Sequence, residues 1–379
     1  MKVLVAVNEF KGSLTSREIA NLILNLANSR YENIEITAEV IADGGDGFLD
    51  IFNNFNNFNK KEVYVNNAMG EKIKANYLVD YKSNKAVIEV AEIIGLKKVN
   101  KMDPYIASTH SLGEVIKILL QENITEFIIG LGGSATNDCG IGMLSALGYK
   151  FLDKDNKECM HGINGLSKIV KIDNSQINEN LKNASFTLVS DVDNTLYGKN
   201  GATYVFSKQK GLSEKDFEVV DNYINEFTKI VYNNFNIDYS NTPGSGAAGG
   251  LAYGFLTFTN SEIKKGSEFM IEYLEIEKKI KEIDIVITGE GKLDLQSFMG
   301  KAPIEIAKVA KKHNKKVIFL AGTISDNEIA TLDINTQHII DASFSILRGI
   351  SNLENAMNKK NAISNLENTV SQIFNLLEI

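Results

Sequence analysis

Four apolar segments of this chain each run into a short stretch of glycines and polar or acidic residues, and this repeated pattern constrains the fold more than any other feature. The segments are 34–41, 127–129, 186–189 and 283–287, and the stretches that follow them are Asp43–Gly47, Gly132–Gly142, Asp191–Asn194 and Thr288–Asp294. In open α/β sheets, ligands bind at the carboxyl ends of the strands. A single strand end followed by glycines and acidic residues is typical of an ordinary turn, but four of them in one chain predict a ligand site. We expect the four strand ends to converge on one cleft.

The second of these stretches has the order strand, glycine-rich turn, helix, because the apolar run 143–147 follows it. Adjacent glycines let the backbone approach a ligand, and a helix that begins there points free N–H groups at an anion. We therefore expect a phosphate or carboxylate site formed by Gly132, Gly133, Ser134, Thr136, Asn137 and Asp138. A tight strand-to-helix turn with an ordinary cap is the alternative.

Length and charge narrow the class of protein. With 379 residues the chain is too long for one ordinary domain, so two domains are expected. A net charge of −8, without a stretch dense in Lys and Arg, argues against a nucleic-acid partner. No apolar run approaches the roughly 20 residues of a membrane span, so no membrane partner is expected. Cys139 and Cys159 fit no zinc spacing, and a reducing cytoplasm is the expected setting.

The two ends of the chain share one pattern, in which short strands alternate with helices. We predict strands at 3–7, 34–41, 283–287, 316–321 and 339–346, and helices at 16–28, 302–312 and 353–377. The sequence Thr15-Ser16-Arg17-Glu18 predicts a capping box, and Pro303 suits the first turn of its helix. This alternation is typical of a doubly wound parallel sheet.

The middle of the chain departs from this alternation, since two strands are predicted in succession, at 72–79 and 85–89, before the glycine-rich loop. We therefore predict one α/β domain built from residues 1–63 and 282–379, and a second α/β domain, residues 64–281, inserted into it.

Ordered motifs along the whole chain resemble the bacterial glycerate kinases of the first type. They are Phe10-Lys11-Gly12-Ser13-Leu14-Thr15, Ala42-Asp43-Gly44-Gly45-Asp46-Gly47, Gly130 to Asp138, Asp191-Val192-Asp193-Asn194, Gly201-Ala202, Gln209-Lys210-Gly211, Pro243 to Gly250, Thr288-Gly289-Glu290-Gly291 and Gly300-Lys301-Ala302-Pro303. Each motif alone is weak, but the ordered set is specific. The resemblance implies a flavodoxin-like, Rossmann-like domain from both chain ends with an inserted α/β domain. It also implies transfer of phosphate from ATP to D-glycerate, at the C2 hydroxyl, giving 2-phosphoglycerate and ADP.

The chain departs from the family's pattern at several of these positions. Asn8 stands where the family usually has an aspartate, Asp46 where it has a glutamate, and Lys292 where it has an arginine. Lysine keeps the charge of arginine but loses its bidentate fork. His110 stands in place of a common tyrosine. None of these changes removes the carboxylate cluster.

Phosphoryl transfer requires charge neutralisation, positioning and a base near the acceptor hydroxyl, and the candidate residues fit those needs. We expect Asp191 and Asp193, with Asp294 nearby, to hold Mg²⁺ and orient the hydroxyl, one of them acting as base. Lys11 completes the catalytic set, as a cation for an anionic group. The expected substrate- and phosphate-binding residues are Ser13, Asp43, Gly44, Gly45, Asp46, Gly132, Gly133, Ser134, Thr136, Asn137, Asp138, Gly244, Gly246, Glu290 and Lys292.

Other residues and functions stay open. Lys210 fits an anion-binding group or a surface lysine equally, and His110 and His161 read as satisfied polar residues. The stretch Asp191-Val192-Asp193-Asn194-Thr195 also resembles the nucleophile motif of haloacid-dehalogenase-type phosphatases, although it lies mid-chain. A non-catalytic sensor of a small hydroxy acid or nucleotide is the other alternative. The chain acts as a monomer or a homodimer.

Overall fold

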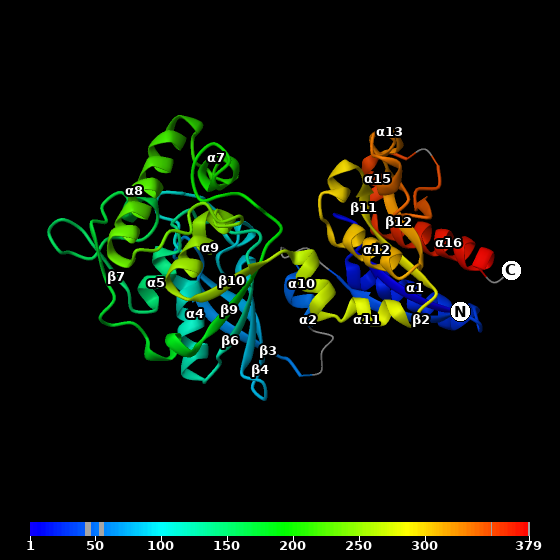
Figure 1. Cartoon of the computed structure of the whole chain (residues 1–379), viewed down its shortest axis with the longest axis horizontal. Coiled ribbons are helices and arrows are strands. Elements are labelled where there is room, and N and C mark those ends of the chain that lie inside the picture. The colour runs from blue at the N-terminus through cyan, green and yellow to red at the C-terminus, as the bar shows by residue number, and fades with distance from the viewer. Residues whose placement is uncertain (42–46, 53–56, 350, 378–379) are drawn as a thin grey trace. The chain divides into compact units, whose positions relative to one another are not determined.

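The computed structural model describes residues 1–41, 47–52, 57–349 and 351–377. The chain forms two units: residues 1–43 and 266–379 build the first, and residues 44–265 build the second. Both chain ends, blue and red in Figure 1, therefore belong to the first unit. Within the described ranges, no helix is long and apolar enough to cross a membrane.

The first unit contains a five-stranded parallel sheet in the order β13-β12-β11-β1-β2. Its strands are β1 (Lys2–Val7), β2 (Glu35–Val40), β11 (Ile285–Leu293), β12 (Lys316–Ile324) and β13 (Ala342–Ser345). Numbered within the unit, this order is 2-1-3-4-5, which is the flavodoxin-like arrangement. The predicted doubly wound parallel sheet is confirmed.

Helices cover both faces of this sheet. The helices of the unit are α1 (Ser16–Arg30), α10 (Gly266–Tyr273), α11 (Ile276–Lys281), α12 (Ala302–Lys312), α13 (Asp326–Ile329), α14 (Ile334–Gln337), α15 (Leu353–Met357) and α16 (Lys359–Leu377), with the 3-10 turn η5 at Leu295–Phe298. On β12, Ile318 and Leu320 pack with α1 and α16, whereas Phe319 and Ala321 pack with Ile304 of α12. Because alternate residues of a strand face opposite sides, α12 lies across the sheet from α1 and α16.

Local sequence explains where two of these helices begin. Thr15 accepts a hydrogen bond from the backbone of Glu18, whose side chain accepts from the backbone of Thr15 in return, so the predicted capping box is present. Pro303 lies in the first turn of α12, where its missing N–H costs nothing.

The second unit contains a six-stranded sheet in the order β10-β9-β6-β5-β4-β3. Strands β5, β6, β9 and β10 run parallel, while β4 and β3 continue the sheet antiparallel. The strands are β3 (Asn59–Asn66), β4 (Lys72–Asp80), β5 (Lys85–Glu89), β6 (Glu126–Gly130), β9 (Ser185–Val189) and β10 (Asn260–Lys264), and a separate ribbon pairs β7 (Lys150–Leu152) with β8 (Lys171–Asp173).

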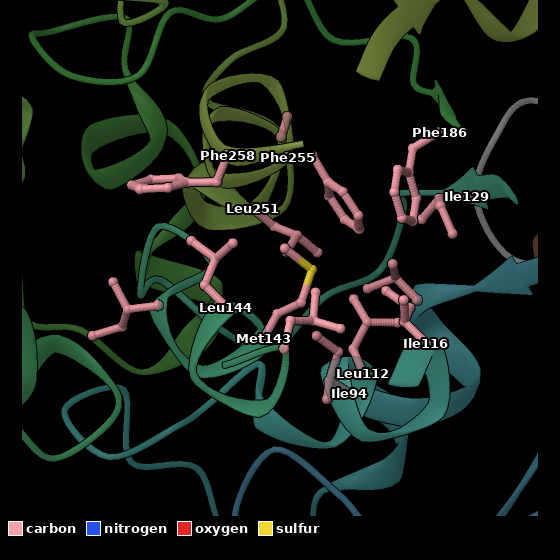
Figure 2. Close-up of a cluster of buried hydrophobic side chains, with 14 of the residues drawn as sticks. Ile94, Leu112, Ile116, Ile129, Met143, Leu144, Phe186, Leu251, Phe255 and Phe258 are labelled. Carbon is pink, nitrogen blue, oxygen red and sulfur yellow. The ribbon is translucent and has the colours of Figure 1, made fainter. Parts of the chain in front are cut away.

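The helices of the second unit enclose one large core. They are α2 (Phe48–Phe52), α3 (Val90–Ile94), α4 (His110–Gln121), α5 (Ile141–Ala146), α6 (Ile163–Leu166), α7 (Ala202–Phe206), α8 (Phe217–Phe235) and α9 (Ala247–Phe258), with 3-10 turns η1 (Leu96–Lys98), η2 (Glu179–Asn183), η3 (Lys208–Lys210) and η4 (Glu214–Asp216). Figure 2 shows Leu251 and Phe255 of α9 in one cluster with Met143 of α5, Ile129 of β6 and Phe186 of β9. The same buried cluster includes residues of β5, β6 and β9, so the parallel strands pack against it.

The chain passes between the units at different residues from those we predicted. Strand β3 pairs with β4 along its whole length, so residues 59–63 belong to the second unit. Helices α10 and α11 contact α12, so residues 266–281 belong to the first. The observed crossings at 43–44 and 265–266 therefore replace the predicted ones at 63–64 and 281–282.

Candidate active site

In the first unit the candidate residues lie where the strand order reverses. The chain leaves the unit after β2, and the next strand that it adds to this sheet, β11, lies on the other side of β1. In doubly wound sheets, ligands bind at the carboxyl ends of the strands that flank such a reversal. A Cβ atom on Gly291 of β11 would lie 3.3 Å from the backbone nitrogen of Lys11, so the loop after β1 passes close beside β11.

Lys11 is exposed at the tip of this loop. Phe10 and Leu14 form an isolated bridge around it, and Gly12 takes a positive φ of 79° that glycine tolerates. The hydroxyl of Ser13 donates to the carbonyl of Phe10 at 2.9 Å. Lys11 thus presents its charge at the strand end, whereas Ser13 stabilises the turn.

Glu290 lies at the same edge and is buried, with a side chain only 8% exposed. Its Oε2 accepts from the ammonium of Lys301 at 2.7 Å, while its Oε1 has no hydrogen-bond partner among the described residues. A buried carboxylate oxygen without a partner is costly, and such groups gather at functional sites. Lys301 is therefore a residue of this edge that the predicted site lacked, although it lies in one of the family motifs.

Lys292 and Asp294 pair with each other, because the Lys292 ammonium lies 3.0 Å from Oδ2 of Asp294. Asp294 also caps η5, accepting from the backbone N–H groups of Gln296 at 3.0 Å and Ser297 at 3.3 Å. Burial acts to raise the pKa of Asp294, but Lys292 and the cap hydrogen bonds outweigh it and hold the pKa below its usual value. This geometry favours a structural role for Asp294. Asp43, Gly44, Gly45 and Asp46 lie outside the described residues.

In the second unit the predicted loops share one edge of one sheet. Strands β5, β6, β9 and β10 end in register, and the loops that follow β6 and β9 start side by side. The backbone N–H of Leu131 donates to the carbonyl of Val189 at 3.1 Å, and that of Ser190 donates to Lys264 at 3.1 Å. The four strand ends are divided between two sheets, since β2 and β11 belong to the first unit. That all four converge on one cleft stays a prediction.

The glycine loop after β6 exposes its tip and buries its sides. Gly133 is exposed, with a positive φ of 72°, and Gly132 is half-buried. The carbonyl of Gly133 accepts from Leu96 at 2.9 Å, and the N–H of Ala135 donates to Ile94 at 2.8 Å. The two glycines therefore present backbone at the strand end while their neighbours are tied to the segment after α3.

The helix that we expected at this loop begins later, and it has no free N–H groups for a ligand. Helix α5 starts at Ile141, and Asp138 lies before it, fully buried. One carboxylate oxygen of Asp138 accepts from the N–H of Gly142 and from the N–H and hydroxyl of Thr109, at 2.9–3.3 Å, and the other accepts from Gly140 at 3.1 Å. Burial raises the pKa of Asp138, and these bonds oppose the shift. The structure thus gives Asp138 the role of an internal cap, not that of a ligand group.

Ser134, Thr136 and Asn137 also point into the protein. Thr136 and Asn137 are fully buried, and Ser134 is 4% exposed. The side-chain nitrogen of Asn137 donates to Thr203 at 3.3 Å, but Asn137 Oδ1 and the Thr136 hydroxyl have no partner among the described residues. The predicted loop is therefore in the predicted place, with only its glycines at the surface.

Asp191 and Asp193 follow β9 and are exposed. Asp193 Oδ2 lies 3.3 Å from the ammonium of Lys265, which follows β10. Asp294 belongs to the first unit, and in the described part of the chain no three His, Cys, Asp or Glu side chains cluster so as to hold a metal ion. Two exposed carboxylates still fit Mg²⁺, which takes one or two carboxylate ligands and completes its shell with water and phosphate oxygens.

Gly244 and Gly246 pack against the loop that carries these aspartates. A Cβ on Gly246 would lie 2.3 Å from the carbonyl oxygen of Thr195, and the N–H of Gly246 donates to Asn194 at 3.0 Å. Gly244 has a positive φ of 85°. Because glycine has no Cβ, both residues let their backbone pack closely against the backbone of residues 192–195, and this packing supports the loop that carries Asp191.

Lys210 is the main site residue that the predicted set lacked. It is only 2% exposed, and its ammonium donates to the Thr136 carbonyl at 2.6 Å and to the Ser134 hydroxyl at 3.2 Å. Burial lowers its pKa to about 7, and the charge of Asp138 acts in the opposite direction. Its place in the Gln209-Lys210-Gly211 motif was the signal that pointed to it.

His110 and His161 stack with ring centroids 4.8 Å apart beside a hollow of about 540 Å³. Burial and the neighbouring His110 lower the pKa of His161, so its imidazole is neutral at pH 7. His110 lies 3.8 Å from Glu114. That the two histidines are satisfied polar residues stays a prediction.

Comparison with known proteins identifies the family. A profile of the glycerate kinase family matches residues 3–378. The chain belongs to this family. The chain is 36% identical to the glycerate 2-kinase of Escherichia coli K12, over 94% of this chain and 93% of that one. It is also 36% identical to the glycerate kinase of Bacillus subtilis 168, over 98% and 97% of the two chains.

A structural comparison agrees with that assignment. A crystal structure of a glycerate kinase 2 from Salmonella typhimurium LT2 superposes with a TM-score of 0.86 at 32% identity, covering 100% of this chain and 98% of that one. The chain is therefore an enzyme, a phosphotransferase of the glycerate kinase family, as the sequence motifs indicated.

Proposed function

We propose that this enzyme transfers the γ-phosphoryl group of ATP to the C2 hydroxyl of D-glycerate, giving 2-phosphoglycerate and ADP, in the cytoplasm. The observation that carries the proposal is the shared edge of the second sheet, where the loop with Gly132 and the exposed Gly133 starts beside the loop with the two aspartates. A phosphoryl transferase needs an anion-binding backbone next to carboxylates, because it must both hold phosphate oxygens and engage the acceptor hydroxyl. The curated relative from Escherichia coli carries the name glycerate 2-kinase, which supports transfer to C2.

Gly132 and Gly133 would bind an anionic group through backbone N–H groups, either the substrate carboxylate or a phosphate. Asp191 and Asp193 would hold Mg²⁺, which neutralises phosphate charge when it is bound. One of the two aspartates would accept the proton of the acceptor hydroxyl. If the glycines hold the carboxylate of glycerate, the C2 hydroxyl next to that carboxylate lies closer to the aspartates than the terminal hydroxyl does.

In the first unit, Lys11 and the Glu290–Lys301 pair at the strand reversal would serve an anionic ligand. Lys11 offers an exposed cation there. Lys301 is 33% exposed while it also neutralises the buried Glu290, so it too offers charge at this edge. Misplacement of a reacting group by about 1 Å can cost on the order of a hundredfold in rate. The groups that bind the anionic parts of the substrate therefore decide which of its hydroxyls reacts.

The product of the reaction tests the proposal. The protein is incubated with ATP, Mg²⁺ and D-glycerate, and the product is passed to enolase alone or to enolase with phosphoglycerate mutase. A signal with enolase alone identifies 2-phosphoglycerate, whereas a signal that needs the mutase means 3-phosphoglycerate and rejects C2. Release of phosphate from phosphoesters without ATP would instead favour the phosphatase, and saturable binding without turnover would favour a sensor.

A further inference from the structure

Lys210 occupies an unusual position for a lysine, beneath the glycine loop and away from solvent. It lies at the end of η3, which Gly211 terminates with a positive φ of 86°. Its ammonium contacts the loop at two points, the Thr136 carbonyl and the Ser134 hydroxyl. The two contacts cross 74 and 76 residues of sequence, so Lys210 ties η3 to a loop that is distant along the chain.

No carboxylate of the described residues forms an ion pair with this ammonium, and both of its hydrogen bonds go to neutral oxygens. Buried charges are normally paired, because removing a charge from water is costly. The same two segments also carry three buried oxygens without a partner among the described residues: the hydroxyls of Thr136 and Ser207, and Oδ1 of Asn137. Lys210 is thus a buried cation that forms no ion pair, although the charge of Asp138 acts on it, and it lies among polar groups left unpaired. An anion bound nearby would supply the missing ion-pair partner.

We propose that Lys210 is a positioning residue for phosphoryl transfer: it holds the glycine loop through Ser134 and Thr136, and its positive charge stabilises an anionic group bound at the exposed Gly132–Gly133 tip. The inference rests on the proposed function of that tip. The group bound at the tip is an anionic oxygen, either of the glycerate carboxylate or of an ATP phosphate.

A consequence follows for the proton on Lys210. An anion bound at the tip favours the charged form of a nearby lysine and raises its pKa. Because burial holds that pKa at about 7 in the free protein, ligand binding at pH 8 takes up close to one proton. The titratable group whose charge acts on Lys210 is Asp138 of the loop. Lys208 of the same turn pairs with Glu214, and His161 is a further titratable group that interacts with Asp138.

Isothermal titration of the whole protein at pH 8, in buffers of different ionisation enthalpy, measures this proton directly. D-Glycerate and a non-hydrolysable ATP analogue with Mg²⁺ are titrated in separate arms, and the arm with proton uptake identifies the group at the tip. Uptake approaching one proton in one arm supports the proposal. No uptake in either arm overturns it, and this result needs no variant.

Three variants separate charge from structure. Lys210→Met should weaken binding of that ligand about 10- to 100-fold, because a positive charge several ångströms from the bound anion is lost, and it should abolish proton uptake. Lys210→Arg should retain affinity without uptake, because a guanidinium does not deprotonate. Lys208→Met, on the same turn but exposed and paired with Glu214, should behave as the wild type.

If Lys210→Met keeps wild-type affinity and wild-type proton uptake while its melting temperature falls, Lys210 is only structural and the inference is wrong. Phosphorylation of glycerate by the wild type is measured alongside. If the wild type does not phosphorylate glycerate, the proposed function is rejected. If the wild type turns over normally and Lys210→Met has the wild-type ligand affinity and proton uptake, only the role of Lys210 is rejected.

Discussion

Replacing Asp138 tests whether the acid of the glycine loop serves the fold or a ligand. In the structure its carboxylate is fully buried and accepts four hydrogen bonds, from Thr109 twice and from Gly140 and Gly142. The Thr109 hydroxyl in turn accepts from the N–H of Met143 at 2.9 Å. Asp138 therefore joins the start of α4 to the start of α5.

The cost of each substitution follows from the donors that it leaves unpaired. Asp138→Ala strands three backbone N–H groups, each worth about 1–2 kcal/mol when it is buried without a partner, so a loss of about 3–6 kcal/mol is expected. In Asp138→Asn, the amide oxygen can still accept the three hydrogen bonds from Thr109 and Gly142. The amide nitrogen then faces the backbone N–H of Gly140, and neither of these two donors can accept from the other. We expect a loss of about 2 kcal/mol for that variant.

Urea unfolding monitored by far-UV circular dichroism and tyrosine fluorescence measures these losses, since the chain has no tryptophan. Asp153→Asn is the matched control, because Asp153 accepts two backbone N–H bonds in an exposed turn. Its unfolding free energy should change by no more than about 0.5 kcal/mol. If Asp138→Asn unfolds at the wild-type urea concentration but has lost its affinity for substrate or nucleotide, Asp138 is a ligand group and the structural interpretation fails.

Three further predictions concern the two sheet edges. Asp191→Asn and Asp193→Asn should each lower kcat by a factor of roughly 100 or more, measured with saturating ATP and D-glycerate, and near-normal turnover of both would contradict their role. Gly133→Val should weaken ligand binding while its melting temperature falls no further than that of Gly198→Val, another glycine with positive φ, at 89°; wild-type affinity would reject a binding role for the loop. Lys301→Met leaves the buried Glu290 unpaired and should destabilise the fold by about 3 kcal/mol in urea, against less than about 0.5 kcal/mol for Lys308→Met, whose partner Glu305 is 25% exposed where Glu290 is 8% exposed; equal losses would show that the buried pair carries no special cost.

Much of the fold could be predicted because it depends on local signals. The capping box at Thr15, the proline in the first turn of α12 and the alternation of apolar strands with amphipathic helices each lie within a few residues. The crossings between the units could not be placed in the same way. Strand β3, with the sequence Asn-Lys-Lys-Glu-Val-Tyr-Val-Asn, is largely exposed, and only its pairing with β4 assigns it to the second unit.

In the candidate site too, local sequence predicts where the loops lie, whereas contacts with distant residues decide how their side chains are used. Strand ends rich in glycine and carboxylates predicted two of the candidate loops at one edge, because parallel strands that end in register bring the loops after them side by side. Whether each side chain faces a ligand or the protein depends on partners far along the chain. Asp138 has its cap partner 29 residues away, at Thr109, and Ser134 meets Lys210 across 76 residues. Sequence therefore predicted the loop, while the structure separates its exposed glycines, which can bind an anion, from the buried polar residues that hold them in place.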